Sequence, residues 1–334
     1  MEKEEKATST PYGRKRGKPF NYLHKLIKLC AFLIMAICYY HHTFWMLPMY
    51  YEGDPHKEWK MKIEMALVYL SLTILISTFI IVGIVEPGYT FKQEEKIITD
   101  KAFERLKMLS KEANRIKGEK ELDTYVKDHN KRIDVPMAEF KDNYNYSLFC
   151  KKCNIYRYPR THHCSVCNTC VFLMDHHCVW LDNCVGVNNM RYFLAFLCVA
   201  PLSTLYYNIY AFPHYFEIMW ENGSVMSIEA LFTTTGSDLF EMTAYHLGLA
   251  VTIVLGFYFV KIIHGMSKGT SSLERLRDET DNTYHIEFNK AWDSVFGRTL
   301  FPMSFVLAPW MTSQKHIDII MKDYYRFDKV EVTS

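Results

Sequence analysis

Long stretches without charge alternate along this chain with long stretches that are rich in charge. Four windows contain no Asp, Glu, Lys or Arg, and they are Leu29–Leu47 (19 residues), Met65–Val85 (21 residues), Tyr192–Phe216 (25 residues) and Met242–Val260 (19 residues). A helix crosses a ~30 Å hydrocarbon core with roughly 20 residues. Buried helices of soluble proteins are usually shorter and interrupted by charges, so the pattern predicts four membrane-spanning helices.

Lys and Arg residues are unevenly distributed among the segments that flank these windows. Seven lie in residues 1–25, seventeen in 86–190 and ten in 261–334, whereas 48–62 contain three and 217–241 contain none. The loops of a membrane protein that carry the excess of Lys and Arg are the cytoplasmic ones. We therefore expect a multi-pass integral membrane protein of the endomembrane system or plasma membrane, with its N- and C-termini and its middle segment in the cytosol.

The same pattern divides the chain into six consecutive parts. They are a cytosolic N-terminal segment (1–28), helices 1 and 2 (29–85), a charged cytosolic linker (86–149), a cysteine-rich domain (150–190), helices 3 and 4 (191–264) and a cytosolic C-terminal tail (265–334). The formal net charge is +2, from 39 basic and 37 acidic residues. This balance excludes a bulk polycation, so nucleic-acid binding through overall charge is disfavoured.

Candidate chemistry is concentrated in the cysteine-rich domain, which holds seven of the ten cysteines. The segment reads Cys150-x2-Cys153-x9-His163-Cys164-x2-Cys167-x2-Cys170-x4-Asp175-His176-His177-Cys178-x5-Cys184. CxxC pairs with nearby His and Cys have the spacing of zinc sites. Disulfides are disfavoured because the segment is expected to face the reducing cytosol. The segment lacks a long apolar run, which predicts that it needs the metal to fold.

The number of candidate ligands exceeds what two tetrahedral sites require. Eight ligands are needed, and the segment offers seven Cys together with His163, His176 and His177, with His162 as a further possibility. A surplus Cys beside a His and an Asp is an arrangement for nucleophilic catalysis, in which the imidazole takes the thiol proton and the carboxylate orients the imidazole. Asp175, His176 and Cys178 supply these three groups within four residues.

The position of Cys178 adds to this interpretation. It lies fourteen residues before the third window, so its sulfur is expected near the cytosolic membrane interface. There a long-chain thioester could bury its chain among the helices, with about 0.8 kcal/mol gained per buried CH₂.

The stretch 150–193 resembles the DHHC cysteine-rich domain of protein S-acyltransferases, also called palmitoyltransferases. Asp175-His176-His177-Cys178 is the signature itself, and Cys184-Val-Gly186-x2-Asn189-x3-Phe193 fits the continuation of the family pattern. The four predicted spans also fit. The resemblance implies an all-α polytopic membrane protein with four transmembrane helices and a cytosolic zinc-binding domain between the second and third.

The resemblance also implies an activity and its residues. A long-chain acyl group, such as that of palmitoyl-CoA, would pass from acyl-CoA to Cys178 and then to cysteines of cytosolic or membrane-associated proteins near the bilayer. This is ping-pong catalysis with His176 as the base and Asp175 orienting it. Two zinc ions would be bound, one by Cys150, Cys153, His163 and Cys170, the other by Cys164, Cys167, His177 and Cys184. Arg157 and Arg160 would face the CoA phosphates.

Two short segments depart from the family pattern. Glu86-Pro87-Gly88 resembles its Asp-Pro-Gly, and Ser271-Ser272-Leu273-Glu274 resembles its Thr-Thr-x-Glu. Two other interpretations of the whole chain are a membrane-anchored zinc scaffold without catalysis and a RING-like ubiquitin ligase with cross-braced zinc sites. Both leave Cys178 without a role.

Overall fold

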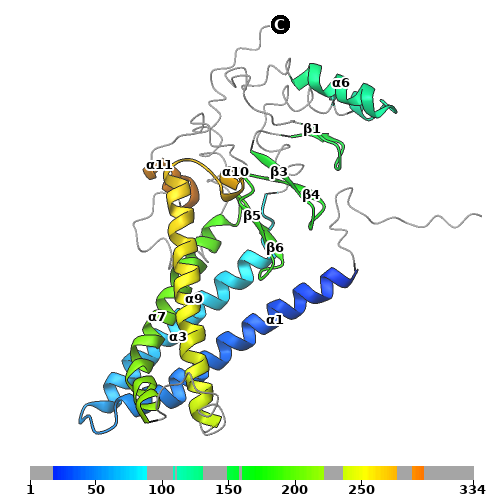
Figure 1. Cartoon of the computed structure of the whole chain (residues 1–334). Coiled ribbons are helices and arrows are strands. Elements are labelled where there is room, and N and C mark those ends of the chain that lie inside the picture. Colours follow the sequence, from blue (N-terminus) through cyan, green and yellow to red (C-terminus); the bar gives the residue numbers. More distant parts are fainter. Residues whose placement is uncertain are drawn as a thin grey trace, which may run out of the picture.

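The computed structural model describes residues 18–88, 108–109, 111–130, 149–157, 160–221, 236–276 and 288–296. Most of the predicted N-terminal segment, linker and tail lies outside these ranges. The described chain is mostly helical, with α1 (Lys18–His41), the π-helix η1 (His42–Met46), α2 (Leu47–Tyr50), α3 (Lys57–Ile84), α6 (Glu119–Asn130), α7 (Met190–Glu221), α9 (Gly236–Ser267), α10 (Ser272–Leu276) and α11 (Phe288–Phe296). Figure 1 shows the long helices running together, with short strands gathered at one end.

Four helical segments are long and apolar enough to cross a membrane. They are Lys25–Tyr50, Lys57–Ile84, Met190–Trp220 and Asp238–Ser267. Each predicted window falls on one of them, so the prediction of four helices long and apolar enough to span a membrane is confirmed. Their outward faces are apolar, as on α9, where Ile253, Phe257 and Val260 are all more than 60% exposed. Such a face suits a hydrocarbon solvent because its side chains are apolar. The backbone polar groups of the helix are hydrogen-bonded within the helix and need no water.

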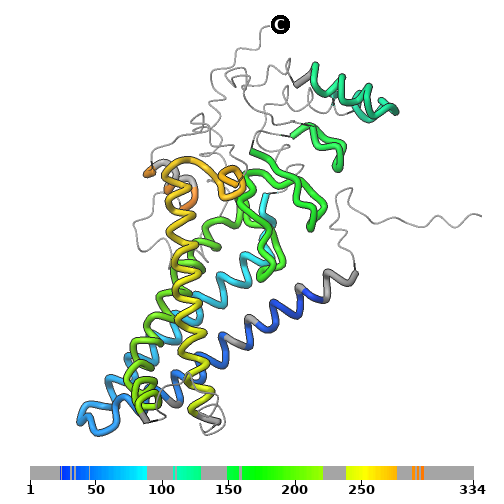
Figure 2. Tube along the Cα trace, viewed as in Figure 1, coloured from blue at the N-terminus to red at the C-terminus, as the bar shows by residue number. Residues whose placement is uncertain are grey.

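The first of these segments changes its helical geometry at η1. The N–H of Leu47 donates to the carbonyl of His42, five residues back, which widens the turn. Pro48 follows, and a proline ring clashes with the carbonyl four residues before it in a regular α-helix. The wider turn accommodates Pro48. Figure 2 shows that α1 diverges from the other long helices toward its N-terminal end, and Phe32 already contacts Phe79 of α3, with 4.9 Å between ring centroids.

Polar side chains tie the helices together inside the bundle. Tyr39 of α1 and Ser71 of α3 are 3.1 Å apart through their hydroxyls. Thr204 of α7 and Thr252 of α9 are joined in the same way at 2.8 Å. Between apolar helices in lipid, such hydrogen bonds and close packing replace the hydrophobic driving force.

The cysteine-rich segment forms three antiparallel hairpins, which the all-α expectation did not include. The strands are β1 (Phe149–Cys150), β2 (Ile155–Tyr156), β3 (Thr161–Cys164), β4 (Thr169–Phe172), β5 (His176–Cys178) and β6 (Asn183–Val185). They pair as β1–β2, β3–β4 and β5–β6. Their turns contain Asn154, Asn168 and Asp182 at positive φ, which Asn and Asp tolerate better than most residues. The strands are two to four residues long, so helices dominate and the helical class holds.

One seam joins these hairpins to the end of α3. The side-chain amide of Asn183 donates to the carbonyls of Val82 (2.8 Å) and Val85 (2.9 Å), and its oxygen accepts the N–H of Cys184 (3.0 Å). Further along, the Phe172 N–H donates to the Gly88 carbonyl at 2.8 Å. The Glu86-Pro87-Gly88 segment therefore contacts the cysteine-rich segment through the backbone carbonyl of Gly88.

A second seam joins the hairpins to the segment that follows α9. The Arg160 guanidinium makes two hydrogen bonds to the Glu274 carboxylate, at 2.7 and 2.8 Å, and a third to the Gly269 carbonyl at 2.8 Å. Both side chains of the ion pair are 6% exposed. Glu274 also accepts the Ser271 N–H, and Ser271 Oγ accepts the Glu274 N–H, which is the capping box of α10. The Ser271–Glu274 segment is thus a buried helix start held by an ion pair.

We expect Asn183→Ala to destabilise the protein by about 2–4 kcal/mol, because it removes three hydrogen bonds and leaves buried backbone groups unpaired. Thermal unfolding of the detergent-solubilised protein, followed by loss of the monodisperse peak, measures the effect. Asn114→Ala is the matched control, since Asn114 is exposed and makes one long contact of 3.5 Å to the Asn154 carbonyl. Equal unfolding temperatures for the two variants would contradict this account of the seam.

Arg160→Met should destabilise the protein by about 3–5 kcal/mol, because it leaves the buried Glu274 carboxylate without its partner. The double variant Arg160→Met/Glu274→Gln should recover most of that loss, since Gln keeps the capping box and carries no charge. A double-mutant cycle of unfolding temperatures tests this. Strict additivity of the two single substitutions would show that the pair contributes nothing.

Candidate functional site

The structure brings eight Cys and His side chains together in two groups. Within each group the ligand atoms all lie within 4.8 Å of one another, and the groups are Cys150, Cys153, His163 and Cys170, and Cys164, Cys167, His177 and Cys184. These are the two sets that the family resemblance implies. The members alternate along the chain, so that neighbouring residues His163 and Cys164 belong to different groups. Both groups could hold a metal ion.

Hairpin register assembles each group. His163 pairs with Cys170 across β3–β4, and His177 pairs with Cys184 across β5–β6. Directly paired residues of antiparallel strands have their Cβ atoms roughly 5 Å apart. Each hairpin therefore supplies one imidazole and one thiol to the same point, and a CxxC turn supplies the other two thiols.

The spacing of these atoms fits a tetrahedral metal ion. His163 Nδ1 lies 3.2 Å from Cys153 Sγ and 3.5 Å from Cys150 Sγ. His177 Nδ1 lies 3.4 Å from Cys167 Sγ and 3.5 Å from Cys184 Sγ. Zn–S and Zn–N bonds of about 2.3 and 2.0–2.1 Å give tetrahedron edges of roughly 3.5–3.8 Å. The donor set and spacing therefore suit a closed four-ligand site.

Alternation along β5 separates a second set of groups from the metal ligands. Successive side chains of a strand point to opposite faces. His177 joins the second Cys/His group, so His176 and Cys178 share the other face. That face lies against the helices, where the His176 ring contacts Phe193 of α7 (5.1 Å between centroids) and Tyr258 of α9 (5.6 Å).

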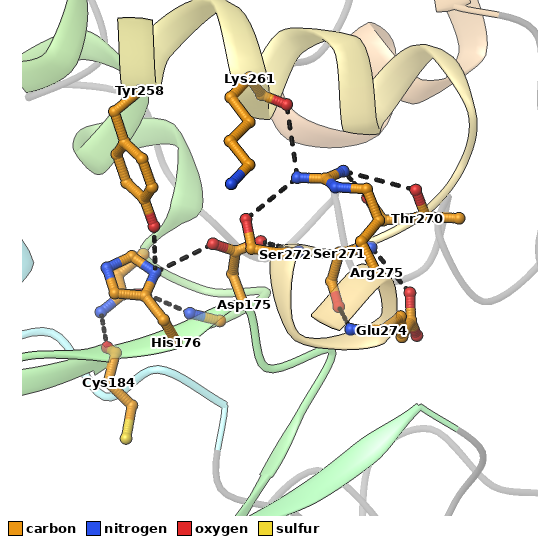
Figure 3. Close-up of polar contacts among 12 residues, drawn as sticks. Asp175, His176, Cys184, Tyr258, Lys261, Thr270, Ser271, Ser272, Glu274 and Arg275 are labelled. Atoms are coloured by element: carbon orange, nitrogen blue, oxygen red, sulfur yellow. Dashed lines mark hydrogen bonds and ion pairs between the residues drawn. The ribbon is translucent and has the colours of Figure 1, made fainter. Parts of the chain in front are cut away.

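Asp175 and His176 form a buried pair (Figure 3). The Asp175 carboxylate is 3% exposed, and one of its oxygens accepts a hydrogen bond from His176 Nδ1 at 2.9 Å. The other oxygen accepts the backbone N–H of Ser272 at 2.7 Å. Tyr258 directs its hydroxyl to within 3.2 Å of the same imidazole nitrogen. The imidazole is thereby fixed in orientation, with Nδ1 facing Asp175 and Nε2 left for another partner.

The protonation of this pair follows from its contacts. Burial lowers the pKa of His176, but hydrogen bonds and charge interactions with Asp175 and Cys178 raise it more, to about 9. Burial raises the pKa of Asp175, but its hydrogen bonds to His176 and Ser272 have the larger total effect. The pKa of Asp175 therefore lies below its usual range. Asp175 therefore stays a carboxylate, and His176 favours its protonated form beside it.

Arg160 does not lie where the resemblance places it. Its guanidinium is buried and engaged by Glu274 and Gly269, so it is part of the second seam and is not directed outward at a phosphate. Arg157 donates from Nη1 to the Thr161 carbonyl at 3.2 Å. His162, the further possible ligand, is 1% exposed and lies outside both groups.

Two contributors to the site have no clear signal in the sequence. Tyr258 is one aromatic residue among many in the fourth window. Ser272 lies in a segment that the resemblance singles out, and it bonds to Asp175 through its backbone N–H and its hydroxyl. A Ser in place of Thr keeps both groups, which explains why the geometry tolerates this departure from the family pattern.

A cavity of ≈ 430 Å³ lies between the four long helices, and its lining residues come from α1, η1, α3, α7 and α9. Its near end includes Met35, Phe196 and Leu255, which pack against the same apolar cluster as Cys178. Its far end includes His42 and Tyr207. Residue numbers identify the two ends of the cavity. The chain runs away from the hairpins along α1 and α7 and back toward them along α9, so later residues of α1 and α7 lie farther from the hairpins. The site thus combines a thiol, an oriented imidazole and an adjoining apolar cavity.

Comparison with known proteins agrees with this geometry. The family model described as DHHC palmitoyltransferase matches residues 143–279. A protein described as "Probable protein S-acyltransferase 13", from Arabidopsis thaliana, is 32% identical over 151 residues. The matched stretch covers 45% of this chain and 48%, about half, of that relative.

The family match contains both Cys/His groups, the Asp175–Cys178 segment, α7 and the Ser271–Glu274 turn. Residues 143–279 of this chain are therefore similar to the DHHC palmitoyltransferase domain.

Proposed function

We propose that this chain is a protein S-acyltransferase that moves a long-chain acyl group from acyl-CoA to protein cysteines through an acyl-Cys178 intermediate. The observation that carries the proposal is the position of Cys178. It shares a strand face with His176, which is bonded to buried Asp175, and it packs against the cluster that borders the cavity. A zinc scaffold or a RING-like ligase would need the two Cys/His groups and gives no reason for this arrangement.

The first half-reaction uses the thiol and the imidazole. Cys178 Sγ bonds to the acyl carbonyl carbon, and the bond from that carbon to the CoA sulfur breaks. The thiol proton passes to His176 Nε2 and then to the departing CoA sulfur. Asp175 holds Nδ1, which fixes the tautomer and stabilises the imidazolium.

The second half-reaction reverses these roles with a protein thiol. The substrate sulfur bonds to the acyl carbon, the bond to Cys178 Sγ breaks, and the substrate proton returns to Cys178 through His176. The net change is acyl-CoA plus protein thiol to acylated protein plus CoA, with no oxidant or reductant. This is the ping-pong scheme of covalent catalysis.

The cavity would receive the acyl chain. The distance from His176 to the far end of the cavity follows from α7, because Phe193 lies beside His176 and Tyr207 lines the far end. Fourteen residues separate them, which is about 21 Å of helix. Two acyl chains end to end fill the ~30 Å hydrocarbon core of a bilayer, so one long chain extends about 15 Å. A chain of the palmitoyl class therefore fits between Cys178 and the cavity end.

We infer that each Cys/His group holds one zinc ion. Three thiolates and one imidazole form a closed ligand set, which is typical of structural rather than catalytic zinc. Zinc would supply the attachment that so small a set of strands lacks, because the apolar cluster among the hairpins consists largely of cysteines. The chemistry would then rest on Cys178, His176 and Asp175, outside both groups.

The surroundings of the enzyme follow from the charge distribution. The four helices would cross a membrane of the endomembrane system or the plasma membrane, with both termini and the DHHC domain in the cytosol. Substrates would be cytosolic or membrane-associated proteins whose cysteines approach the bilayer surface. Arg157 remains a candidate contact for CoA phosphates.

Cys178→Ala should abolish hydroxylamine-labile self-acylation when the detergent-solubilised protein is given alkyne-palmitoyl-CoA, because the attacking sulfur is gone. His176→Ala should lower the labelling rate by about 10²–10⁴-fold, the range typical of general acid–base catalysis. Cys198→Ala, a half-buried thiol of α7, is the matched control and should label like wild type. Label that persists in Cys178→Ala, or never appears in zinc-replete wild type, would favour the scaffold interpretation.

Cys167→Ser should reduce bound zinc from two ions per chain to one or fewer, and self-acylation should be lost with it. The reason is that the second group fixes β5, which carries Cys178. Elemental analysis of the purified protein measures the metal. Cys178→Ser should retain both ions while losing the label, and a loss of zinc from this variant would place Cys178 among the ligands instead.

A further inference from the structure

The far end of the cavity differs chemically from its walls. His42 lines the cavity there, and the residue is 3% exposed. Neither of its ring nitrogens has a hydrogen-bond partner within the part of the chain that the structure describes. An imidazole in the membrane-spanning part of a protein is rare, and such residues mark functional sites.

The local geometry directs His42 inward. His42 is the first residue of η1, and π-helical turns are frequent at functional sites. Its ring is surrounded edge-on by three tyrosines of α7, with centroids 5.5 Å from Tyr206, 6.0 Å from Tyr207 and 5.9 Å from Tyr210. The neighbouring His41 faces α9 instead, where its Nε2 lies 3.6 Å from Oε1 of Glu241.

Other polar groups around this end are only partly paired. One oxygen of the Glu64 carboxylate, Oε1, accepts hydrogen bonds from Tyr51 at 2.5 Å and from Tyr210 at 2.7 Å. Among the described residues, Glu64 Oε2 and the Tyr206 hydroxyl have no hydrogen-bond partner. His42 and Tyr206 both line the cavity with unused hydrogen-bonding capacity, and a buried polar group without a partner is unfavourable unless a ligand or water supplies one.

We propose that His42 recognises a hydroxyl group at or near the free end of the acyl chain, so that the cavity selects hydroxylated long-chain acyl groups over plain ones. This inference rests on the proposed acyltransferase function and specifies its substrate class. A plain methyl end would leave His42 unpaired. A hydroxyl both donates and accepts, so it pairs with either tautomer of the imidazole.

The test is a competition at Cys178. Purified wild type receives equal amounts of a plain acyl-CoA and its ω-hydroxy counterpart, with chains of 14, 16 or 18 carbons, and intact-protein mass spectrometry measures the two adducts. We expect a preference for the hydroxylated chain of about tenfold at one chain length, where the hydroxyl reaches His42. A site that hydrogen-bonds a substrate group discriminates against the analogue that lacks it.

Three variants identify the residue responsible. His42→Leu should abolish the preference and raise the use of the plain chain, whereas His42→Gln should keep part of it, because its amide still forms hydrogen bonds. Tyr39→Phe is the matched control, since Tyr39 lines the same cavity but its hydroxyl already meets Ser71. It should leave the preference unchanged. Labelling by palmitoyl-CoA and zinc content show that each variant is folded.

The possible outcomes separate this inference from the function on which it rests. Wild type that labels with palmitoyl-CoA but shows no preference above twofold at any length would overturn the role of His42 and leave the acyltransferase intact. A preference that survives in His42→Leu would do the same. Wild type that accepts neither chain would overturn the proposed function, and the inference with it.

Discussion

Strand alternation at β5 is the constraint on which the rest of this site depends. His177 must face the second Cys/His group, and His176 and Cys178 then have to face the helices. A slip of one residue would exchange the two faces and direct Cys178 at the metal ligands. A three-residue strand cannot hold its register by its own hydrogen bonds. The pairing of His177 with Cys184 inside the second Cys/His group holds it, so the position of Cys178 depends on that group.

The hairpins are also held from outside, and these attachments reach the same residues. Asn183 ties β6 to the end of α3, and the turn after α9 gives its Ser272 N–H to Asp175. Tyr258 of α9 contacts His176 directly. The orientation of the imidazole therefore depends on the hairpins, α7 and α9 together. A change in helix packing would be transmitted to the pair of Asp175 and His176 through contacts that are visible in the structure.

The sequence predicts the parts of this picture that depend on local pattern. Four uncharged windows predict four membrane helices, and the spacing of Cys and His predicts metal binding. What it does not reveal depends on pairing over long distances. Arg160 and Glu274 are 114 residues apart, and no periodicity indicates that they form a buried ion pair rather than a phosphate contact. The hairpins were also missed, because their strands are too short to show alternation. At Ser271–Ser272 the hydrogen bonds use backbone N–H groups and hydroxyls, which a Ser supplies as well as a Thr.

The pairing of buried polar groups differs between the two ends of the bundle. Near the hairpins, buried polar groups meet one another, as Asp175 does with His176 and Arg160 with Glu274. At the far end, two tyrosine hydroxyls donate to one oxygen of the Glu64 carboxylate, whereas its other oxygen and both ring nitrogens of His42 have no hydrogen bond among the described residues. Folding alone would favour an apolar residue there, because an unpaired imidazole in an apolar site opposes stability. Positions where a protein departs from such a local rule are the ones at which function is expected to compensate. The cavity is therefore better described as a binding site with a polar end than as a gap between four apolar helices.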